Sequence, residues 1–185
     1  MPHHDEWEKE IKTIIKVEEN KNLHAFSTMP EDECNVKAKR TAWDSHIRYN
    51  SVNNIVNDIK NFIEIENYDA PNLHALDCWI NWYEKNQYAI PHSHIGNLSV
   101  VYFIDIEKTN TKFLFHKNSN FELVKKKDLK NFFKSTIKDI PIKNGTVVMF
   151  PSRMLHSVTP NLSDNRRITL AINFGVNYEE ERKEY

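Results

Sequence analysis

Glycine is scarce in this chain, with only 3 among 185 residues. The sequence contains neither Gly-x-x-x-x-Gly-Lys nor Gly-x-Gly-x-x-Gly, the two motifs whose backbone cradles nucleotide phosphates. A nucleotide-binding fold therefore has no support. So little glycine also argues against long flexible linkers of low complexity.

Cysteine, net charge and long apolar runs are also limited. Cys34 and Cys78 are the only cysteines and form no Cys-x-x-Cys pair, which predicts reduced thiols rather than a disulfide scaffold. The net charge of −1 creates no general attraction to nucleic acid or to a membrane surface. No run reaches the roughly eighteen apolar residues of a membrane helix. The start of the chain lacks the basic and apolar parts of a signal peptide. These features predict a cytoplasmic protein without a membrane partner, and they say nothing of its oligomeric state.

The length and the hydrophobic fraction of 39% suit one domain with a substantial core. We expect an N-terminal buttress of helices and loops over residues 1–72 and a β-rich core over 73–177. The acidic residues 178–185 are expected to form a mobile tail.

Helical spacing is clear in two parts of the buttress. Residues 5–19 place apolar side chains at intervals typical of a short amphipathic helix, although a hairpin-like arm is an alternative. Residues 51–66 predict a helix more strongly, which would pack one face on a sheet. The apolar residues of this second pattern are Val52, Ile55, Val56, Ile59, Phe62 and Ile63.

From residue 73 the apolar period changes to two, as in β-strands. In residues 75–84, Trp79, Asn81 and Tyr83 share one face, and an asparagine between two aromatic residues indicates a lined cavity. Further strands are expected at 97–106, 112–116, 146–150, 155–159 and 166–176. About eight short strands after the helices predict a mainly β fold, a helix-buttressed antiparallel barrel or jelly roll.

Two segments allow more than one interpretation. Residues 122–143 hold seven lysines and three acidic residues, and they are interpreted as a capped amphipathic helix or as an insertion between strands. Residues 41–46 surround Trp43 with polar side chains. They are interpreted as a surface loop anchored by Trp43, or as a flap near the functional site.

Pro91-His92-Ser93-His94 is the motif that indicates chemistry. On extended backbone, residues i and i+2 point the same way, so His92 and His94 can bind one metal ion. A third ligand, His156, would come from a distant strand and leave other coordination positions open. Three protein ligands with open positions are typical of a catalytic rather than a structural metal site.

The same residues carry a resemblance to a known family. The chain resembles the small iron(II)- and 2-oxoglutarate-dependent oxygenases, and it is most similar to those common in phage and marine bacterial genomes, relatives of the prolyl hydroxylases. The resemblance covers residues 41–176, and it implies a double-stranded β-helix, the jelly-roll fold shared with cupins. The residues that carry it are Trp79-x-Asn81, Tyr83, Pro91-His92-x-His94, Leu98-Ser99-Val100-Val101-Tyr102, Phe150-Pro151-Ser152, His156, Arg167-Ile168-Thr169 and Asn173.

The resemblance implies roles for individual residues. His92 and His156 match the two histidines that hold iron(II) in the family, whereas His94 stands where a carboxylate is usual. Arg167 and Thr169 match the Arg-x-Ser/Thr pair that binds the distal carboxylate of 2-oxoglutarate, and Tyr83 and Asn81 are further candidates. Arg166 should point the other way. The implied reaction uses O2, decarboxylates 2-oxoglutarate to succinate and CO2, and most often hydroxylates a substrate.

Other functions stay open on the sequence. A three-histidine cupin-type dioxygenase, another metal enzyme such as a zinc hydrolase, or a non-catalytic binding barrel would also use these histidines. The glutamate that cupins add shortly after His-x-His is missing from Ile95-Gly96-Asn97-Leu98. The sequence does not identify the substrate. A small molecule is favoured, and a peptide or a nucleobase is an alternative.

Overall fold

The computed structural model describes residues 3–21, 35–65, 73–116 and 137–176. Cys34, the predicted tail and residues 122–136 of the lysine-rich segment lie outside these ranges. None of the helices in the described ranges is long and apolar enough to cross a membrane.

Helix α1 (His4–Asn20) confirms the helical interpretation of the first segment and rules out the hairpin-like arm. Its buried residues include Trp7, Ile11, Ile14 and Ile15, of which Ile11 lies four residues after Trp7 and three and four before the other two, on one face. The helix starts at His4, whose Nδ1 lies 2.6 Å from the hydroxyl oxygen of buried Tyr102. The start of α1 is therefore tied to the sheet beneath it.

Helices α2 (Ser45–Arg48) and α3 (Asn50–Ile65) follow after two very short strands. Helix α3 buries Val52, Ile55, Val56, Ile59 and Ile63, as predicted. Phe62 is different, because 49% of its surface is exposed. At 100° per residue it falls on the edge of the apolar stripe rather than at its centre.

In the described ranges, ten strands form two five-stranded antiparallel sheets, where the sequence predicted about eight strands. One sheet has the order β2-β3-β10-β5-β8 and the other β1-β4-β9-β6-β7. The strands are β1 (Val36–Lys37), β2 (Lys39–Arg40), β3 (Leu73–Tyr83), β4 (Tyr88–His92), β5 (Leu98–Asp105), β6 (Phe113–His116), β7 (Ile137–Ile140), β8 (Val147–Pro151), β9 (His156–Val158) and β10 (Arg167–Val176).

Strands β1 and β2 come from the N-terminal part of the chain, where no strand was expected. They pair with β4 and β3, respectively, so residues 36–40 pass from one sheet to the other. Strand β7 lies within the lysine-rich segment and pairs with β6. The helical interpretation of that segment is therefore wrong for residues 137–140, where backbone pairing with β6 determines the structure.

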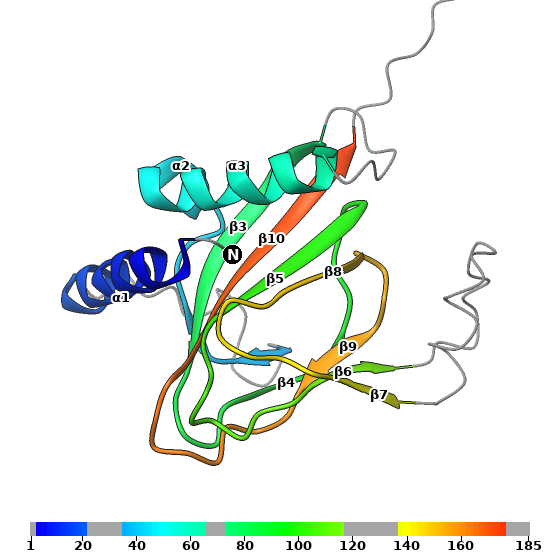
Figure 1. The fold of residues 1–185 in the computed structure, drawn as a ribbon. Coiled ribbons are helices and arrows are strands. Elements are labelled where there is room, and N and C mark those ends of the chain that lie inside the picture. The colour runs from blue at the N-terminus through cyan, green and yellow to red at the C-terminus, as the bar shows by residue number, and fades with distance from the viewer. Residues whose placement is uncertain (1–2, 22–34, 66–72, 117–136, 177–185) are drawn as a thin grey trace, which may run out of the picture.

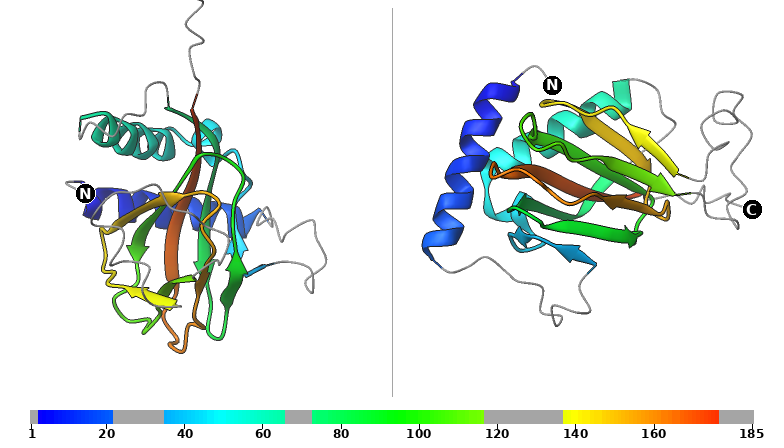
Figure 2. Two further views of the ribbon diagram at one scale, coloured as in Figure 1. Left: turned by 90° about the vertical axis from the view of Figure 1, so that its right-hand side faces the viewer. Right: turned by 90° about the horizontal axis from the view of Figure 1, so that it is seen from below.

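The helices cover the outer face of the sheet that contains β3, β10 and β5, and the second sheet lies on its other side (Figures 1 and 2). Strand β5 shows how side chains divide between the two layers. Val100, Tyr102 and Ile104 pack with the helices, whereas Val101 and Phe103 pack between the sheets. Alternation along one strand thus builds two cores, and the inner one surrounds the candidate site.

Candidate metal and co-substrate site

Three histidines meet between the two sheets. His92 ends β4 and His156 begins β9, and these residues are direct partners in the antiparallel pair. His94 follows two residues later, beyond the strand. One ring nitrogen from each histidine lies within 4.8 Å of the others. The sequence prediction that these residues gather is confirmed, although His94 stands on a loop rather than on a strand.

Hydrogen bonds orient two of the rings. Nδ1 of His92 lies 2.7 Å from the Ile90 carbonyl oxygen, and Nδ1 of His156 lies 3.0 Å from that of Met154. A carbonyl oxygen only accepts, so Nδ1 carries the proton in both rings and Nε2 is left with a lone pair. This tautomer is the one that binds a metal through Nε2.

The separation of the ring nitrogens fits a shared ion. Nε2 of His94 and Nε2 of His156 lie 3.2 Å apart, a spacing that suits two ligands each about 2.1 Å from one divalent metal. Within the described ranges, no carboxylate belongs to this cluster. Three neutral nitrogen donors are a plausible set for iron, zinc or copper.

Burial keeps the three imidazoles neutral. Burial lowers the pKa of His94 to about 4, with repulsion from His92 as the smaller cause. Burial also lowers the pKa of His92. It lowers the pKa of His156 to about 2, with repulsion from His92 as the second cause. Ligation requires unprotonated rings, so the cluster is ready for a metal at neutral pH.

Arg167 is the unusual charge of the site. It begins β10 opposite Tyr83 and only 1% of its surface is exposed. Its Nε and Nη1 atoms have no hydrogen-bond partner among the described residues. Burial lowers its pKa to about 10, so the guanidinium is still charged at neutral pH. A buried cation without an anion is costly, and this arrangement calls for an acidic ligand.

Aromatic rings flank this cation. The guanidinium carbon lies 5.0 Å from the centre of the Tyr83 ring and 5.5 Å from that of Phe103. Such contacts offset part of the desolvation penalty of the cation. Thr169, two residues along β10, is also buried and faces the same pocket.

All seven predicted site residues line one pocket, together with Trp79 as the sequence indicated. Asn81 accepts a hydrogen bond from Nε1 of Trp79 over 3.1 Å. The sequence analysis missed the apolar part of the lining, and Val36 gave no usable signal because β1 is only two residues long. These missed residues are Val36, Val101, Phe113, Val158 and Ala171.

Trp43 lies beside the site without lining the pocket. Its ring centre is 4.5 Å from that of Trp79, which in turn is 5.7 Å from that of His94. The Trp43 carbonyl oxygen accepts a 2.7 Å hydrogen bond from the Cys78 amide. The backbone at Trp43 is therefore held by β3 beside the site, while 46% of the Trp43 surface is exposed, and both interpretations of residues 41–46, an anchored surface loop and a flap, stay open.

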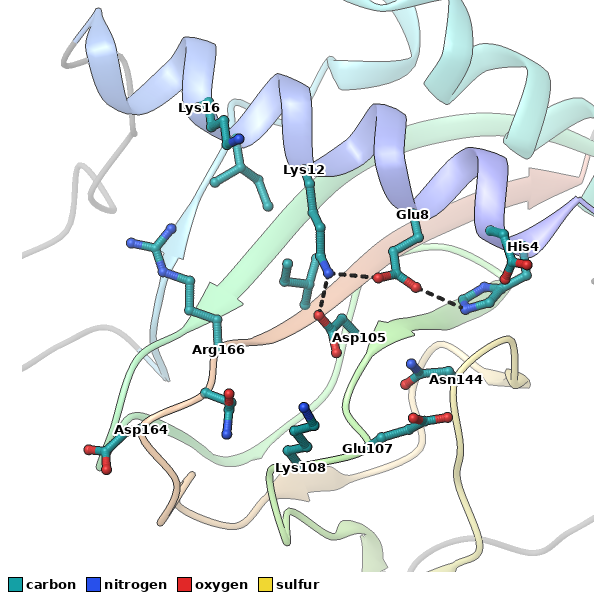
Figure 3. A pocket seen from close by; sticks show the side chains of 14 residues that line it. His4, Glu8, Lys12, Lys16, Asp105, Glu107, Lys108, Asn144, Asp164 and Arg166 are labelled. Carbon is teal, nitrogen blue, oxygen red and sulfur yellow. Dashed lines mark hydrogen bonds and ion pairs between the residues drawn. The ribbon is translucent and has the colours of Figure 1, made fainter.

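A second, larger pocket of about 850 Å³ lies between α1 and the turns around Glu107, Asn144 and Asp164 (Figure 3). Lys12 bridges Glu8 and Asp105, with 2.6 Å to each. Arg166 also lines this pocket and lies 3.0 Å from Glu19 and 2.8 Å from Glu84. Arg166 thus points away from Arg167, as predicted, and its charge is balanced by carboxylates.

The fold and the site define a class of protein, a β-rich metal enzyme that takes an acidic co-substrate. Comparisons with known proteins identify its family. Residues 77–173, more than half of the chain, match the family described as "Putative 2OG-Fe(II) oxygenase". The chain belongs to this family, and it is an oxygenase that depends on iron(II), 2-oxoglutarate and O2. A comparison with curated proteins gives no match.

Solved structures confirm the double-stranded β-helix. A prolyl-4-hydroxylase from Pseudomonas putida superposes with a TM-score of 0.64 at 10% identity, covering 94% of this chain and 88% of the other. HygX from Streptomyces hygroscopicus, with nickel, 2-oxoglutarate and hygromycin B bound, gives 0.60 at 13% identity, with coverages of 93% and 79%.

The alpha-ketoglutarate-dependent epimerase SnoN from nogalamycin biosynthesis gives a TM-score of 0.59 at 14% identity. The match covers 76% of this chain and 61% of SnoN, so the chain spans less than two thirds of that relative. At these identities the comparison shows a common fold.

Proposed function

We propose that the chain hydroxylates a substrate while it decarboxylates 2-oxoglutarate to succinate and CO2. The observation that carries this proposal is the shared pocket of the three histidines and the buried Arg167. His92, His94 and His156 would hold iron(II) through neutral ring nitrogens. Iron supplies the activation of O2 when it is bound, a reaction that protein side chains do not perform by themselves.

Arg167 would bind the distal carboxylate of 2-oxoglutarate. Its planar guanidinium presents several N–H donors to a carboxylate, and Nε and Nη1, on two sides of the group, lack a described partner. Thr169 offers a hydroxyl group on the same face of β10, and Tyr83 lies against the cation. Asn81 has its side-chain oxygen engaged by Trp79, which makes it the weaker of the four candidates.

The remaining lining would keep water away from the reacting groups. Val101, Phe113 and Val158 border the pocket that the histidines and Arg167 share. Phe113 lies with its ring centre 5.4 Å from that of His156. An apolar wall strengthens the interaction between a carboxylate and Arg167, because charges attract more strongly in a medium of low dielectric constant.

A three-histidine dioxygenase without 2-oxoglutarate accounts for the metal ligands and leaves Arg167 unexplained. For the substrate we favour a small molecule, as in HygX, which binds hygromycin B. A peptide is the alternative, as in a prolyl hydroxylase from Trichoplax adhaerens solved in complex with a peptide fragment.

The test is an anaerobic titration of the purified protein with iron(II) and then 2-oxoglutarate. We expect a weak visible charge-transfer band that needs both components. His92→Ala and His156→Ala should abolish iron binding and the band, whereas His94→Asp should keep iron because it restores the usual ligand set.

His116→Ala is the matched control. His116 is a histidine on the neighbouring strand β6, and its Nε2 bonds to the Ser157 hydroxyl over 2.7 Å instead of facing the cluster. It should bind iron like the wild type. If His92→Ala or His156→Ala keeps wild-type decarboxylation of 2-oxoglutarate, the metal site is misassigned.

A further inference from the structure

His94 is the histidine of the cluster whose position a strand does not fix. Strand β4 ends at His92, and His94 follows on the loop that leads to β5. The contact that ties His94 to the opposite loop is made by its backbone, because its amide donates a hydrogen bond of 2.8 Å to the Ser152 carbonyl oxygen. The location of Ser152 therefore determines where the His94 ring can reach.

Ser152 is itself anchored in the protein interior. Its side chain is buried, and its hydroxyl oxygen lies 2.9 Å from that of Ser99. The Ser99 hydroxyl also bonds to Oδ1 of Asn173 over 2.8 Å. Ser99 on β5 and Asn173 on β10 are direct partners within the sheet. This chain of three buried polar side chains connects the loop of Ser152 to the two inner strands.

The loop that contains His94 also contacts strand β10 and the turn of Ser152. The Asn97 amide donates to the Phe174 carbonyl oxygen over 2.9 Å, and the Ser152 amide donates to the Asn97 carbonyl oxygen over 3.2 Å. Gly96, the residue before Asn97, has φ +116°, and a Cβ there would lie 3.1 Å from the Phe174 carbonyl oxygen. A side chain at Gly96 would therefore strain the backbone and crowd the Phe174 oxygen.

We propose that Ser152 is a positioning residue that sets His94 as the third metal ligand. This inference rests on the proposed function, because it requires His94 to bind the metal. The segment that contains Ser152 also holds His156, through the Met154 carbonyl oxygen. His156 depends less on Ser152, because His156 also lies on β9 as the direct partner of His92, whereas the described backbone bond of His94 is the one to Ser152.

Cobalt(II) is the probe, since its visible spectrum reports the number and kind of its ligands. Ser152→Ala removes the hydroxyl that anchors the turn and leaves Ser99 bonded to Asn173. We expect its cobalt(II) affinity to fall about 10–100-fold, as is typical when a partner that orients a ligand is lost. The visible band should change toward that of His94→Ala.

Ser157→Ala is the matched control, because Ser157 is also buried, has one described side-chain hydrogen bond, and adjoins a histidine of the cluster. Its hydroxyl bonds to His116, away from the metal pocket. This variant should keep the wild-type cobalt(II) spectrum and affinity. A loss equal to that of Ser152→Ala would show a general effect of removing a buried hydroxyl, and would overturn the proposal.

A double-mutant cycle separates positioning from folding. If Ser152 acts through His94, adding Ser152→Ala to His94→Ala should cause no further loss of cobalt(II) affinity. Fully additive losses would refute the role of Ser152 and leave the ligand assignment intact. Wild-type affinity in His94→Ala alone would refute the ligand assignment itself. Should Ser152→Ala fail to fold, Ser99→Ala disturbs the same anchor from one hydrogen bond further away.

Discussion

Replacing Arg167 with methionine should separate stability from co-substrate binding. The substitution removes a buried guanidinium whose Nε and Nη1 lack partners among the described residues, and it fills a similar space with an apolar chain. We expect the metal-free variant to be at least as stable as the wild type. We also expect it to lose 2-oxoglutarate binding while its iron affinity stays nearly unchanged.

The magnitudes follow from the surroundings of Arg167. An unpaired buried charge destabilises a fold by several kcal/mol, and the contacts with Tyr83 and Phe103 return about 1–2 kcal/mol each. A net gain of about 0–3 kcal/mol in the unfolding free energy is therefore expected for Arg167→Met. Loss of one partner of a buried ion pair costs about 3–5 kcal/mol, so the 2-oxoglutarate affinity should fall by about two to four decades.

Urea denaturation measures both effects, with nickel(II) in place of iron so that no turnover occurs. At about one hundred times its Kd, 2-oxoglutarate should stabilise the wild type by about 2.7 kcal/mol, and Arg167→Met should show no such shift. Arg166→Met is the matched control: its partly exposed ion pairs are worth about 0–1 kcal/mol, and it should respond to 2-oxoglutarate normally. A wild-type response in Arg167→Met, or the opposite ranking of the two arginines, would refute the reasoning.

Two further predictions concern the scaffold. Burial raises the pKa of Glu19, but hydrogen bonds and attraction from Arg166 outweigh it and hold the pKa below its ordinary 4.5. A lowered carboxyl pKa stabilises the fold above about pH 4.5, and this contribution is lost as the pH falls through the lowered value. Wild-type unfolding free energy should therefore fall faster on acidification than that of Arg166→Met, and parallel urea profiles at pH 7, 5 and 3.5 would contradict this. Gly96→Ala should lower the unfolding free energy by about 1–3 kcal/mol. The loss should exceed that of Gly145→Ala, where φ is +82° and the nearest atom to a Cβ would be a His4 ring carbon at 3.5 Å. Equal losses for the two variants in thermal unfolding would count against the close fit at Gly96.

Much of the site follows from the alternation of side chains along strands. On β3 the period of two assigned Trp79, Asn81 and Tyr83 to the cavity face, and all three line the pocket. The same rule separated Arg167 from Arg166, one buried beside the pocket and the other paired with Glu19. A strand's alternation is a local property, so one sequence is enough to read it.

The parts that could not be predicted depend on contacts between distant segments. Alternation alone would have put His94 on a strand, but β4 ends two residues earlier, and its pairing register with β9 shifts between Ala89 and His92. The Ser152 carbonyl that holds His94 is fifty-eight residues away in the sequence, and no local pattern indicates it. Strands β1 and β2 have two residues each, too few to show any period.

The neutral ligand set makes the two cofactors dependent on each other. Three imidazoles add no negative charge to a divalent ion, and Arg167 contributes a further positive charge at the same pocket. A dianion bound between them would relieve the repulsion of both. Iron and 2-oxoglutarate should therefore bind cooperatively, and linkage requires that each tightens the other by the same factor. With a carboxylate in place of His94 this reciprocal effect would be weaker, because the ion would already be partly neutralised.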